Sequence, residues 1–442
     1  MPQYHRKYLR NVFVETNRLV LFRNILEEKL VKKVRHLIFL ASREDLNYEE
    51  IESYYYAIYS GLIENARQKE LNGDLWKNYL LWLIATNENP FTRTCERLGE
   101  DKIDENLYTA AIHDIKILKD FFDFNFQSIF ELVEDNNIKS LPGSFNFVSS
   151  NSKWNTHYIE KFSLLKKAFV EDLSPEELVD NLSKFYKSVG CGKMGLYTAF
   201  RWLNGRGLVG ITNPDSVTFD DLIGYERQKE TLIENTEAFV NGKAANNILL
   251  YGVRGTGKSS SIKALLNKYS TRGLRLVEVP KSELAGLPEI LQYIRQRAQK
   301  FIIFIDDLSF ESYETEYKHL KALMEGGIQA KPDNVLIYAT SNRKHLVQEK
   351  WSDRNEMEDE IHISDSVEEK LSLADRFGII ITYTSPDQEE YLKIVEGLAE
   401  KYNINMPSHQ LREKALQWER WYNARSGRTA RQFINHLLGT EA

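Results

Sequence analysis

Apolar residues recur every three or four positions through most of the first 205 residues. Residues 19–41 and 75–85 show this spacing with polar or charged residues between, and residues 48–66 repeat it with tyrosines supplying much of the apolar side. Such spacing places apolar side chains on one face of an α-helix. We therefore predict a mostly α-helical N-terminal domain over residues 1–205.

The pattern changes after residue 205. Residues 206–218 contain glycines and a proline among polar residues, which is typical of a linker. Beyond them, short apolar runs alternate with stretches of helical spacing; the runs are residues 247–251, 274–279, 301–305, 335–340 and 378–383. Strands that alternate with helices form parallel sheets with crossover helices. The prediction is an α/β domain over residues 219–385, followed by a helical segment over residues 386–442.

A glycine-rich turn follows the first apolar run. Residues 252–259 fit the phosphate-binding pattern G-x-x-x-x-G-K-[ST], in the strand-to-helix context that the pattern requires. Glycines let the backbone turn tightly so that its N–H groups converge on phosphate oxygens, and the helix start adds a positive dipole end. The predicted phosphate-binding residues are Gly252, Val253, Arg254, Gly255, Thr256, Gly257, Lys258, Ser259 and Ser260. The alternative is a glycine-rich turn without a ligand, and the agreement of motif and context weighs against it.

Acidic and amide side chains follow two of the other apolar runs. Asp306 and Asp307 come directly after the third run, and Asn342 follows the fourth. Beside a phosphate-binding loop, the first carboxylate can hold Mg²⁺ together with the Ser259 hydroxyl, while the second polarises the attacking water. Asn342 can bond that water or the terminal phosphate. Ordinary turn chemistry of Asp and Asn at strand ends is the structural alternative.

Three arginines stand at the boundaries of predicted elements. Arg376 precedes the fifth apolar run, and Arg428 and Arg431 open the last predicted helix. Arginine binds phosphate through planar, charge-assisted hydrogen bonds. Surface arginines without such a role are the alternative, since arginine is most often exposed.

The order of these motifs resembles the AAA+ ATPase superfamily. The resemblance covers about residues 217–440, and the segments ILLYGVRGTGKSSSIKALLNKYS, FIIFIDDLSFE and IYATSNRKHL look closest to an uncharacterised bacterial group of predicted ATP-binding AAA+ proteins. It implies a parallel-sheet P-loop core with a C-terminal helical lid. It also implies ATP and Mg²⁺ as ligands and ATP hydrolysis as the activity.

The resemblance gives each candidate position a role. Lys258 and Ser259 would be Walker A ligands, Asp306 the magnesium-side Walker B acid, Asp307 the catalytic acid, Asn342 the sensor-1 residue and Arg376 the arginine finger. Sensor 2 would be Arg428 or Arg431, with Arg428 favoured. Ile223 and Gly224 would lie against the adenine.

Two departures from the family pattern bear on catalysis. Most AAA+ ATPases carry Asp-Glu where this chain has Asp306 and Asp307, and the shorter second acid reaches less far toward water. The replication-initiator and helicase-loader branch also carries Asp-Asp, so the pair is compatible with slow or partner-stimulated hydrolysis. Asp375 adjoins Arg376 and could pair with it inside the chain. An arginine finger normally serves the neighbouring subunit's nucleotide, which implies a homo-oligomer.

Three hypotheses describe what such a protein acts on. The first is remodelling or assembly of an unidentified protein client held by the N-terminal domain. The tyrosines at 54–56 and 59 could form a surface that binds this client, but core packing explains them better. The second is a DNA-associated ATPase of initiator or helicase-loader type, because arginines between 412 and 431 alternate with Trp418 and Trp421. The net charge of -6 and nearby glutamates disfavour that nucleic-acid partner. The third is a nucleotide-gated scaffold that binds ATP without hydrolysing it.

Composition adds constraints on size and location. The chain has 442 residues, of which 42% are hydrophobic, enough for two or three packed domains. Its two cysteines give no disulfide framework and no metal-ligand spacing. No apolar run approaches the roughly 20 residues of a membrane-spanning helix, and the first residues lack the apolar core of a signal peptide. We therefore expect a cytoplasmic protein without a membrane partner.

Overall fold

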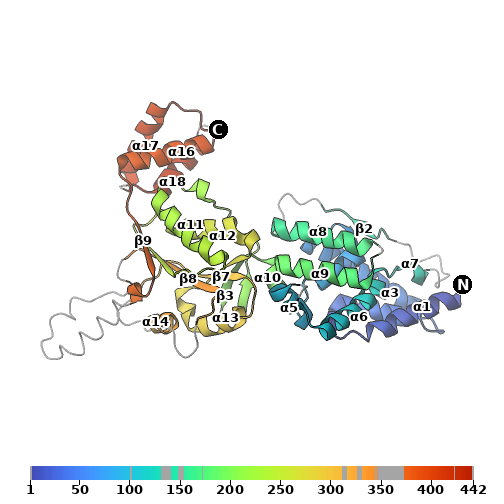
Figure 1. Cartoon of the computed structure of the whole chain (residues 1–442). Coiled ribbons are helices and arrows are strands. Elements are labelled where there is room, and N and C mark those ends of the chain that lie inside the picture. Colours follow the sequence, from blue (N-terminus) through green and yellow to red (C-terminus); the bar gives the residue numbers. More distant parts are fainter. Residues whose placement is uncertain are drawn as a thin grey trace. The chain divides into compact units, whose positions relative to one another are not determined.

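The computed structural model describes residues 2–99, 102–130, 141–147, 154–171, 173–310, 316–325, 331–343, 346, 373–422 and 424–440. The chain divides into two compact units, Met1–Tyr197 and Thr198–Ala442 (Figure 1). The first unit is helical, and the second is built on a parallel sheet.

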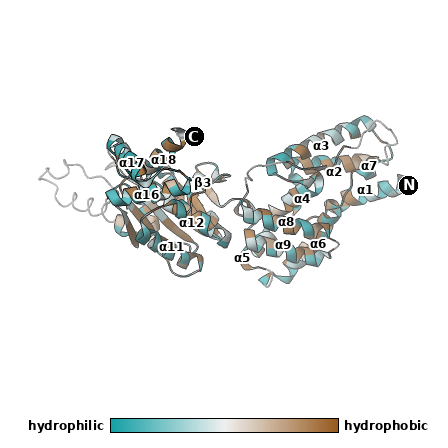
Figure 2. Cartoon of the chain, turned by 90° about the horizontal axis from the view of Figure 1, so that it is seen from above, coloured by the Kyte–Doolittle hydropathy of each residue, from teal (hydrophilic) through white to brown (hydrophobic). Residues whose placement is uncertain are grey.

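The N-terminal unit consists mainly of α-helices, as the spacing of its apolar residues predicts. Its helices are α1 (Pro2–Thr16), α2 (Lys29–Ala41), α3 (Tyr48–Lys69), α4 (Leu75–Ala85), α5 (Pro90–Leu98), α6 (Glu105–Phe122), α7 (Gln127–Phe130), α8 (Thr156–Val170), α9 (Pro175–Val189) and α10 (Lys193–Leu196). A 3-10 helix, Arg23–Glu27, and two short strands, β1 (Gly73–Asp74) and β2 (Ser144–Phe145), accompany them. The helices carry both hydrophobic and hydrophilic residues, and the hydrophobic ones meet in one core (Figure 2). Within the described part of the chain, no helix combines the length and apolar character needed to span a bilayer.

The tyrosines of α3 contribute to this core. Tyr55 is buried, and its hydroxyl accepts a hydrogen bond from the Leu141 amide at 3.2 Å. The hydroxyl of the half-buried Tyr59 donates to the Pro142 carbonyl at 2.6 Å. Tyr56, by contrast, is exposed. Tyr54 is partly buried against the core as well, so three of the four tyrosines pack inward, and Tyr55 and Tyr59 tie α3 to residues 141–142.

The second unit is built around a seven-stranded sheet in the order β4-β3-β6-β7-β8-β5-β9. Its strands are β3 (Ala199–Leu203), β4 (Gly207–Gly210), β5 (Ile248–Gly252), β6 (Leu274–Glu278), β7 (Lys300–Ile305), β8 (Val335–Ser341) and β9 (Ile379–Tyr383). All neighbouring strands pair in parallel except β3 with β4. The five predicted strands are all present. Their near-continuous apolar sequences reflect burial on both faces of a parallel sheet.

Helices lie on both faces of the sheet. Helices α11 (Glu226–Val240) and α12 (Lys258–Tyr269) cover one face, while α13 (Leu287–Ile294) and α14 (Tyr317–Glu325) lie on the other (Figure 1). Short 3-10 helices occur at Phe219–Asp221, Ser270–Arg272 and Lys281–Gly286. The core beneath α11 and α12 takes alternate residues of each strand, which is the period of a pleated strand. The fold is therefore the predicted α/β architecture.

The start of this unit differs from the predicted domain boundaries. Residues up to 205 were expected in the helical domain and residues 206–218 in a linker, yet β3 and β4 form a hairpin at the edge of the sheet. The glycines that suggest a linker serve its turn, because Gly205 and Gly207 have positive φ values of 73° and 69°. β3 also pairs with β6, which anchors the hairpin. Only the residues after Gly210 therefore remain as a connecting segment.

The C-terminal residues form a small helical lid, as predicted from residue 386 onward. It consists of α16 (Gln388–Lys401), α17 (Ser408–Tyr422) and α18 (Gly427–Thr440), which share a hydrophobic core. A capping box opens α16: the Asp387 carboxylate accepts from the Glu390 amide at 2.8 Å, and the Glu390 carboxylate accepts from the Asp387 amide at 3.0 Å. The lid thus has a defined start directly after β9.

The strand order decides which loops meet. β5 lies between β8 and β9, with Gly252 opposite Tyr383 and Tyr251 opposite Ser341. β7 is the next neighbour of β8. Because parallel strands end at the same edge of a sheet, the loops after β5, β7 and β8 share one edge, which is where ligands bind in open α/β sheets.

Candidate nucleotide-binding site

The glycine-rich turn connects β5 to α12 and requires glycine at its first position. Gly252 has a φ of 143°, and a Cβ added there would lie 1.9 Å from the Tyr383 carbonyl oxygen. The next residue also contacts β9: the Val253 amide donates to the same Tyr383 oxygen at 3.1 Å. Gly257, with a φ of 93°, is the N-cap residue directly before α12. The turn therefore lies tightly against β9 and points the start of α12 at the shared edge.

Lys258 is the first residue of α12 and is buried. Its ammonium donates to the carbonyls of Gly252 at 2.9 Å and Val253 at 2.8 Å, and to Asn342 Oδ1 at 3.1 Å. Burial lowers the pKa of Lys258, while the nearby Asp307 and Asp306 carboxylates raise it. The positive charge thus lies inside the turn, linked to the end of β8.

Ser259 and Asp306 meet directly. The Ser259 hydroxyl donates to Asp306 Oδ1 at 2.6 Å, and the Thr340 hydroxyl donates to the same oxygen at 2.6 Å. A serine hydroxyl with a carboxylate is the kind of oxygen-donor set that Mg²⁺ accepts together with phosphate oxygens and water. In the described ranges no cluster of three or more His, Cys, Asp or Glu residues could hold a metal by itself. These oxygen donors are of the kind that could hold a magnesium ion together with phosphate oxygens.

Asp307 and Asn342 form the second contact at this edge. The Asn342 side-chain amide donates to Asp307 Oδ1 at 2.5 Å, and the Asp307 backbone amide donates to the Thr340 hydroxyl at 2.9 Å. Asp307 also has a positive φ of 52°. Asn342 thereby joins Lys258 and Asp307, so that the ends of β5, β7 and β8 are connected by side-chain hydrogen bonds.

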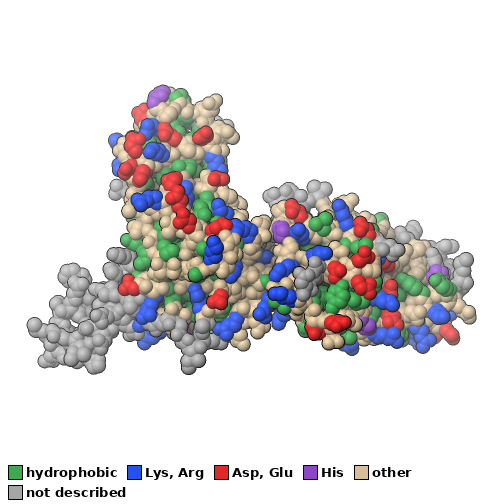
Figure 3. Space-filling view, in the orientation of Figure 1, with side chains coloured by type: hydrophobic (Ala, Val, Ile, Leu, Met, Phe, Trp, Pro, Cys, Tyr) green, Lys and Arg blue, Asp and Glu red, His purple; other side chains and the backbone are tan. Residues whose placement is uncertain are grey.

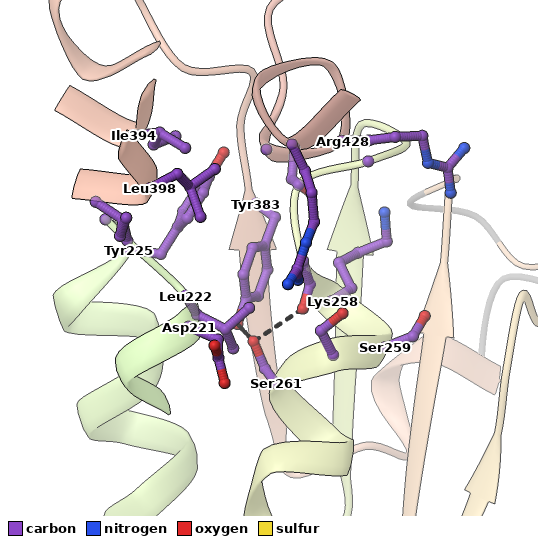
Figure 4. Close-up of a pocket in the computed structure, with 18 of the residues that line it drawn as sticks. Asp221, Leu222, Tyr225, Lys258, Ser259, Ser261, Tyr383, Ile394, Leu398 and Arg428 are labelled. Atoms are coloured by element: carbon purple, nitrogen blue, oxygen red, sulfur yellow. Dashed lines mark hydrogen bonds between the residues drawn. The ribbon is translucent and has the colours of Figure 1, made fainter. Parts of the chain in front are cut away.

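A cavity of about 570 Å³ opens beside the turn, between the sheet edge and the lid. Figure 4 shows Lys258, Ser259 and Ser261 below the lid residues Ile394 and Leu398. The cavity is lined by Asp221, Leu222, Ile223, Gly224, Tyr225, Lys229, Gly255, Thr256, Gly257, Lys258, Ser259, Ser260, Ser261, Lys263, Asp306, Tyr383, Ile394, Leu398, Gly427, Arg428, Arg431, Gln432 and Asn435. Its volume falls in the usual range for small-molecule sites. Cationic and hydroxyl groups lie at one end, and apolar side chains lie at the other.

The apolar end contains the predicted adenine contacts. Ile223 and Gly224 both line the cavity, and Ile223 packs so closely on α16 that a Cβ added at Gly397 would meet its Cδ1 at 2.7 Å. Leu222, Ile394 and Leu398 complete an apolar slot of the kind that suits a purine ring. Ile223 and Gly224, predicted from the sequence as adenine contacts, therefore lie in this apolar end of the cavity.

Two tyrosines of the site were missed by sequence reasoning. The rings of Tyr225 and Tyr383 lie 5.0 Å apart, and the Tyr383 hydroxyl donates to Ser261 Oγ at 3.0 Å (Figure 4). Burial raises the pKa of each tyrosine to about 12, so both stay neutral at physiological pH. Tyr383 is brought to the turn by its register opposite Gly252, for which the sequence alone carries no signal.

The lid contributes both candidate sensor-2 residues to the cavity lining. The Arg428 backbone amide donates to the Gly255 carbonyl at 3.1 Å, and the positive charge of Arg428 lowers the pKa of Lys258. The Arg431 guanidinium donates to the Tyr402 hydroxyl at 2.5 Å within the lid. Arg428 is therefore the arginine whose backbone contacts the glycine-rich turn, whereas the Arg431 guanidinium is bonded within the lid.

Six predicted positions lie outside the cavity lining: Gly252, Val253, Arg254, Asp307, Asn342 and Arg376. Val253 and Arg254 are exposed at the tip of the turn. Arg376 is exposed before the start of β9, at the sheet edge opposite the turn. Asp375 beside it is also exposed. Arg376 is therefore not part of the cavity of its own chain.

The arginines of α17 and the segment after it are largely paired with glutamates. Arg412 donates to Glu389 at 2.6 Å, and Arg425 lies 3.3 Å from Glu419. On the face shown in Figure 3, acidic and basic side chains are interspersed over the lid. Trp421 is 77% exposed, whereas Trp418 packs against neighbouring aromatic rings. These pairings leave less free positive charge than the sequence alone suggests.

Comparison with known proteins identifies a family. Residues 195–441 match the family model described as "Protein of unknown function (DUF815)". The chain is 29% identical over 205 residues to a putative 26S proteasome regulatory subunit homolog of Methanocaldococcus jannaschii, which covers 41% of this chain and 48% of that protein. It is 21% identical over 353 residues to the chromosomal replication initiator protein DnaA of Streptococcus pyogenes, which covers 76% of this chain and 69% of that protein.

A solved structure is similar as well. The Thermotoga maritima RuvB Holliday junction branch migration motor is 16% identical, with a TM-score of 0.30, over 50% of this chain and 72% of that one. The chain spans about half the length of the first curated relative, the proteasome regulatory subunit homolog. Because the family model matches more than half of the chain, and its region contains the P-loop, the parallel sheet and the helical lid, this chain belongs to the DUF815 family of AAA+ P-loop proteins.

Proposed function

We propose that this protein is an ATPase that binds ATP with Mg²⁺ in the cavity beneath the lid and hydrolyses it at an interface between copies of the chain. One observation carries the proposal: Lys258, Ser259 and Asp306 line a cavity of about 570 Å³, and Asp307 and Asn342 are hydrogen-bonded into the same cluster. Catalysis of phosphoryl transfer depends mainly on positioning the reacting groups and stabilising the charge on the phosphates, and this cluster has side chains suited to both.

Different residues along the cavity would bind different parts of the nucleotide. The apolar slot around Ile223 and Leu398 would hold the adenine, and the backbone amides of the turn would bind the phosphates. The Lys258 ammonium, now bonded to two carbonyls of the turn, would exchange them for β- and γ-phosphate oxygens. Ser259 and Asp306 would hold Mg²⁺, whose positive charge offsets the charge that develops on the phosphates.

Asp307 and Asn342 would act on the attacking water. Asn342 holds the Asp307 carboxylate from one side, and the free lone pairs of that carboxylate could accept the water proton as the oxygen attacks the γ-phosphorus. The bond between that phosphorus and the β–γ bridging oxygen breaks, leaving ADP and phosphate. Arg376 would stabilise this charge in a neighbouring copy, because it lies at the opposite sheet edge from its own cavity.

The N-terminal helical unit would hold the protein partner that the ATPase remodels or assembles. A DNA-associated ATPase is the second candidate, supported by the match to DnaA over 76% of the chain. The paired arginines of the lid weigh against the DNA contact that the sequence suggests there.

Phosphate release tests the proposal. The native chain, Lys258→Ala and Lys268→Ala are compared over a protein concentration series with ATP and Mg²⁺; Lys268 is the matched control, since it lies exposed on the same helix outside the cavity. We expect specific activity that rises with protein concentration, disappears in Lys258→Ala and persists in Lys268→Ala. Nucleotide binding without any release above the Lys258→Ala background would refute hydrolysis and leave the scaffold hypothesis. Stimulation by single-stranded DNA that weakens with salt would favour the second candidate.

A further inference from the structure

A second cavity, of about 420 Å³, lies at the opposite edge of the sheet. It is lined by Phe239, Gly242, Lys243, Ala244, Ala245, Lys300, Lys331, Pro332, Asp333, Val335 and Leu336. Its three lysines come from separate segments: Lys243 precedes β5, Lys300 begins β7, and Lys331 precedes β8. We call this cavity the lysine pocket.

The three ammonium groups have few polar partners. The Lys331 ammonium donates to Asn247 Oδ1 at 3.0 Å. The Lys300 ammonium lies 3.5 Å from the Asp333 carbonyl and 5.1 Å from the centre of the Phe239 ring. Within the described ranges, no carboxylate lies within ion-pair distance of either ammonium or of Lys243.

That arrangement differs from other lysines of the same unit. Lys229 pairs with Glu226, Lys263 with Asp215, and Lys401 with Asp221. In the lysine pocket, three lysines and one aspartate give a formal charge of +2, from three positive charges and one negative charge. Like charges gathered in one cavity repel each other, and an anion in that cavity would offset the repulsion.

Lys331 is partly buried in the lysine pocket. Burial lowers the pKa of Lys331, and the Asp333 carboxylate only partly counters that effect. Lysine binds phosphate as a compact point charge with several donors. A doubly charged, multi-oxygen anion matches the formal charge of the pocket and could accept hydrogen bonds from the lysines that line it.

We propose that the lysine pocket is an anion site for a phosphate or diphosphate group, separate from the nucleotide cavity. The group could be free or could belong to a nucleic-acid backbone, since both present the same oxygens. The pocket also has a direct structural connection to the nucleotide cavity. β5, β7 and β8 each begin beside the lysine pocket and end at the P-loop, at Asp306 and at Asn342, respectively.

Binding of pyrophosphate by the full chain tests this site. All variants carry Lys258→Ala, so that the P-loop lysine does not contribute, and isothermal titration compares this background with added Lys243→Gln, Lys331→Met or Lys393→Gln. Lys393 is an exposed lysine on α16 and serves as the control. We expect Lys243→Gln and Lys331→Met each to weaken binding about 10-fold, the loss of one charge-assisted hydrogen bond, and Lys393→Gln to leave it unchanged.

A fluorescent single-stranded oligonucleotide, titrated into the same variants at about 50–200 mM salt, distinguishes the source of the phosphate. Oligonucleotide binding that requires Lys243 and Lys331, without measurable pyrophosphate binding, would assign the phosphate to a nucleic acid. Pyrophosphate binding alone would assign it to a free ligand. The proposal is overturned if neither ligand binds, or if binding is indifferent to both lysines.

Thermal unfolding of each variant checks that the fold is intact. Lys331→Met removes the bond to Asn247, whose Oδ1 still accepts from the Ile337 amide at 3.0 Å. If Lys331→Met unfolds, Lys243→Gln alone tests the anion site. Lys243 is exposed and has no hydrogen bond from its ammonium in the described part of the chain, so its replacement should leave the fold intact.

Discussion

Asp307 adopts a backbone conformation that few residues other than glycine favour. Its φ of 52° lies in the left-handed region, which costs most L-residues about 1–2 kcal/mol, whereas Asp and Asn tolerate it better. The carboxylate is held from the side by Asn342 and the backbone by Thr340. This conformation gives a physical reason for aspartate at a position where AAA+ proteins usually carry glutamate.

Replacing Asp307 with Asn should separate binding from chemistry. Asn keeps the backbone preference and the size of the side chain but removes the base, so we expect phosphate release to fall at least about 100-fold while ATP affinity and thermal stability change little. Asp307→Glu serves as the comparison, and its unfolding midpoint should drop because glutamate lacks the left-handed preference. Unchanged turnover in Asp307→Asn would remove Asp307 from the proposed mechanism.

The two candidate sensor-2 arginines should differ in their effect on ATP binding. The Arg428 amide is bonded to the Gly255 carbonyl of the P-loop, whereas the Arg431 guanidinium is bonded to Tyr402 within the lid. We expect Arg428→Ala to weaken ATP binding about 10-fold, as for loss of a charge-assisted hydrogen bond to phosphate, and Arg431→Ala to weaken it less. Fluorescent-nucleotide titration of both variants measures this. The reverse order of affinities would assign sensor 2 to Arg431.

At the scale of elements, the contact of the P-loop with β9 depends on Gly252. A Cβ at this position would overlap the Tyr383 carbonyl, so Gly252→Ala should cost at least about 3 kcal/mol from strain and overpacking. Gly273→Ala is the matched control: its φ of 88° is also positive, but an added Cβ meets nothing within 4 Å, and we expect about 1 kcal/mol. Urea unfolding compares the two. Equal losses would show that the close approach to β9 carries no cost.

The same elements show what a sequence can predict. The P-loop, both acids and Asn342 could be placed at strand ends because a fixed motif and strong apolar runs mark those ends, and the structure brings them together through parallel pairing. The β3–β4 hairpin was missed because its strands are short and its turn glycines are also typical of linkers. Tyr383 was missed because its place in the cavity depends on strand register, which involves residues more than 100 positions apart.

At the scale of the whole molecule, the proposed role of Arg376 as an arginine finger predicts a dependence on neighbouring copies. β9 separates Arg376 from the P-loop edge of its own chain by five residues of strand, about 16 Å. Lys258→Ala and Arg376→Ala should each be inactive alone. When they are mixed, about a quarter of the sites would combine an intact P-loop with an intact neighbouring arginine, and phosphate release should recover to about that level.

A mixture of Lys258→Ala with Asp307→Asn is the matched control for this complementation. Both changes damage the cavity of their own chain, so no arrangement of copies creates a complete site and no recovery is expected. Recovery in the control, or none in the Arg376→Ala mixture, would contradict an arginine supplied by a neighbouring copy.

The hydrogen bond from the Arg428 amide to the Gly255 carbonyl joins the lid directly to the P-loop. Because Gly255 carries no side chain, the start of α18 rests directly on the backbone that would contact phosphates, and a Cβ at Gly255 would lie 2.9 Å from Ser426 Oγ. Any swing of the lid must therefore release this amide to solvent. The hydrogen-exchange rate of the Arg428 amide would therefore report how often the lid leaves the P-loop. This measurement needs no probe attached to the protein.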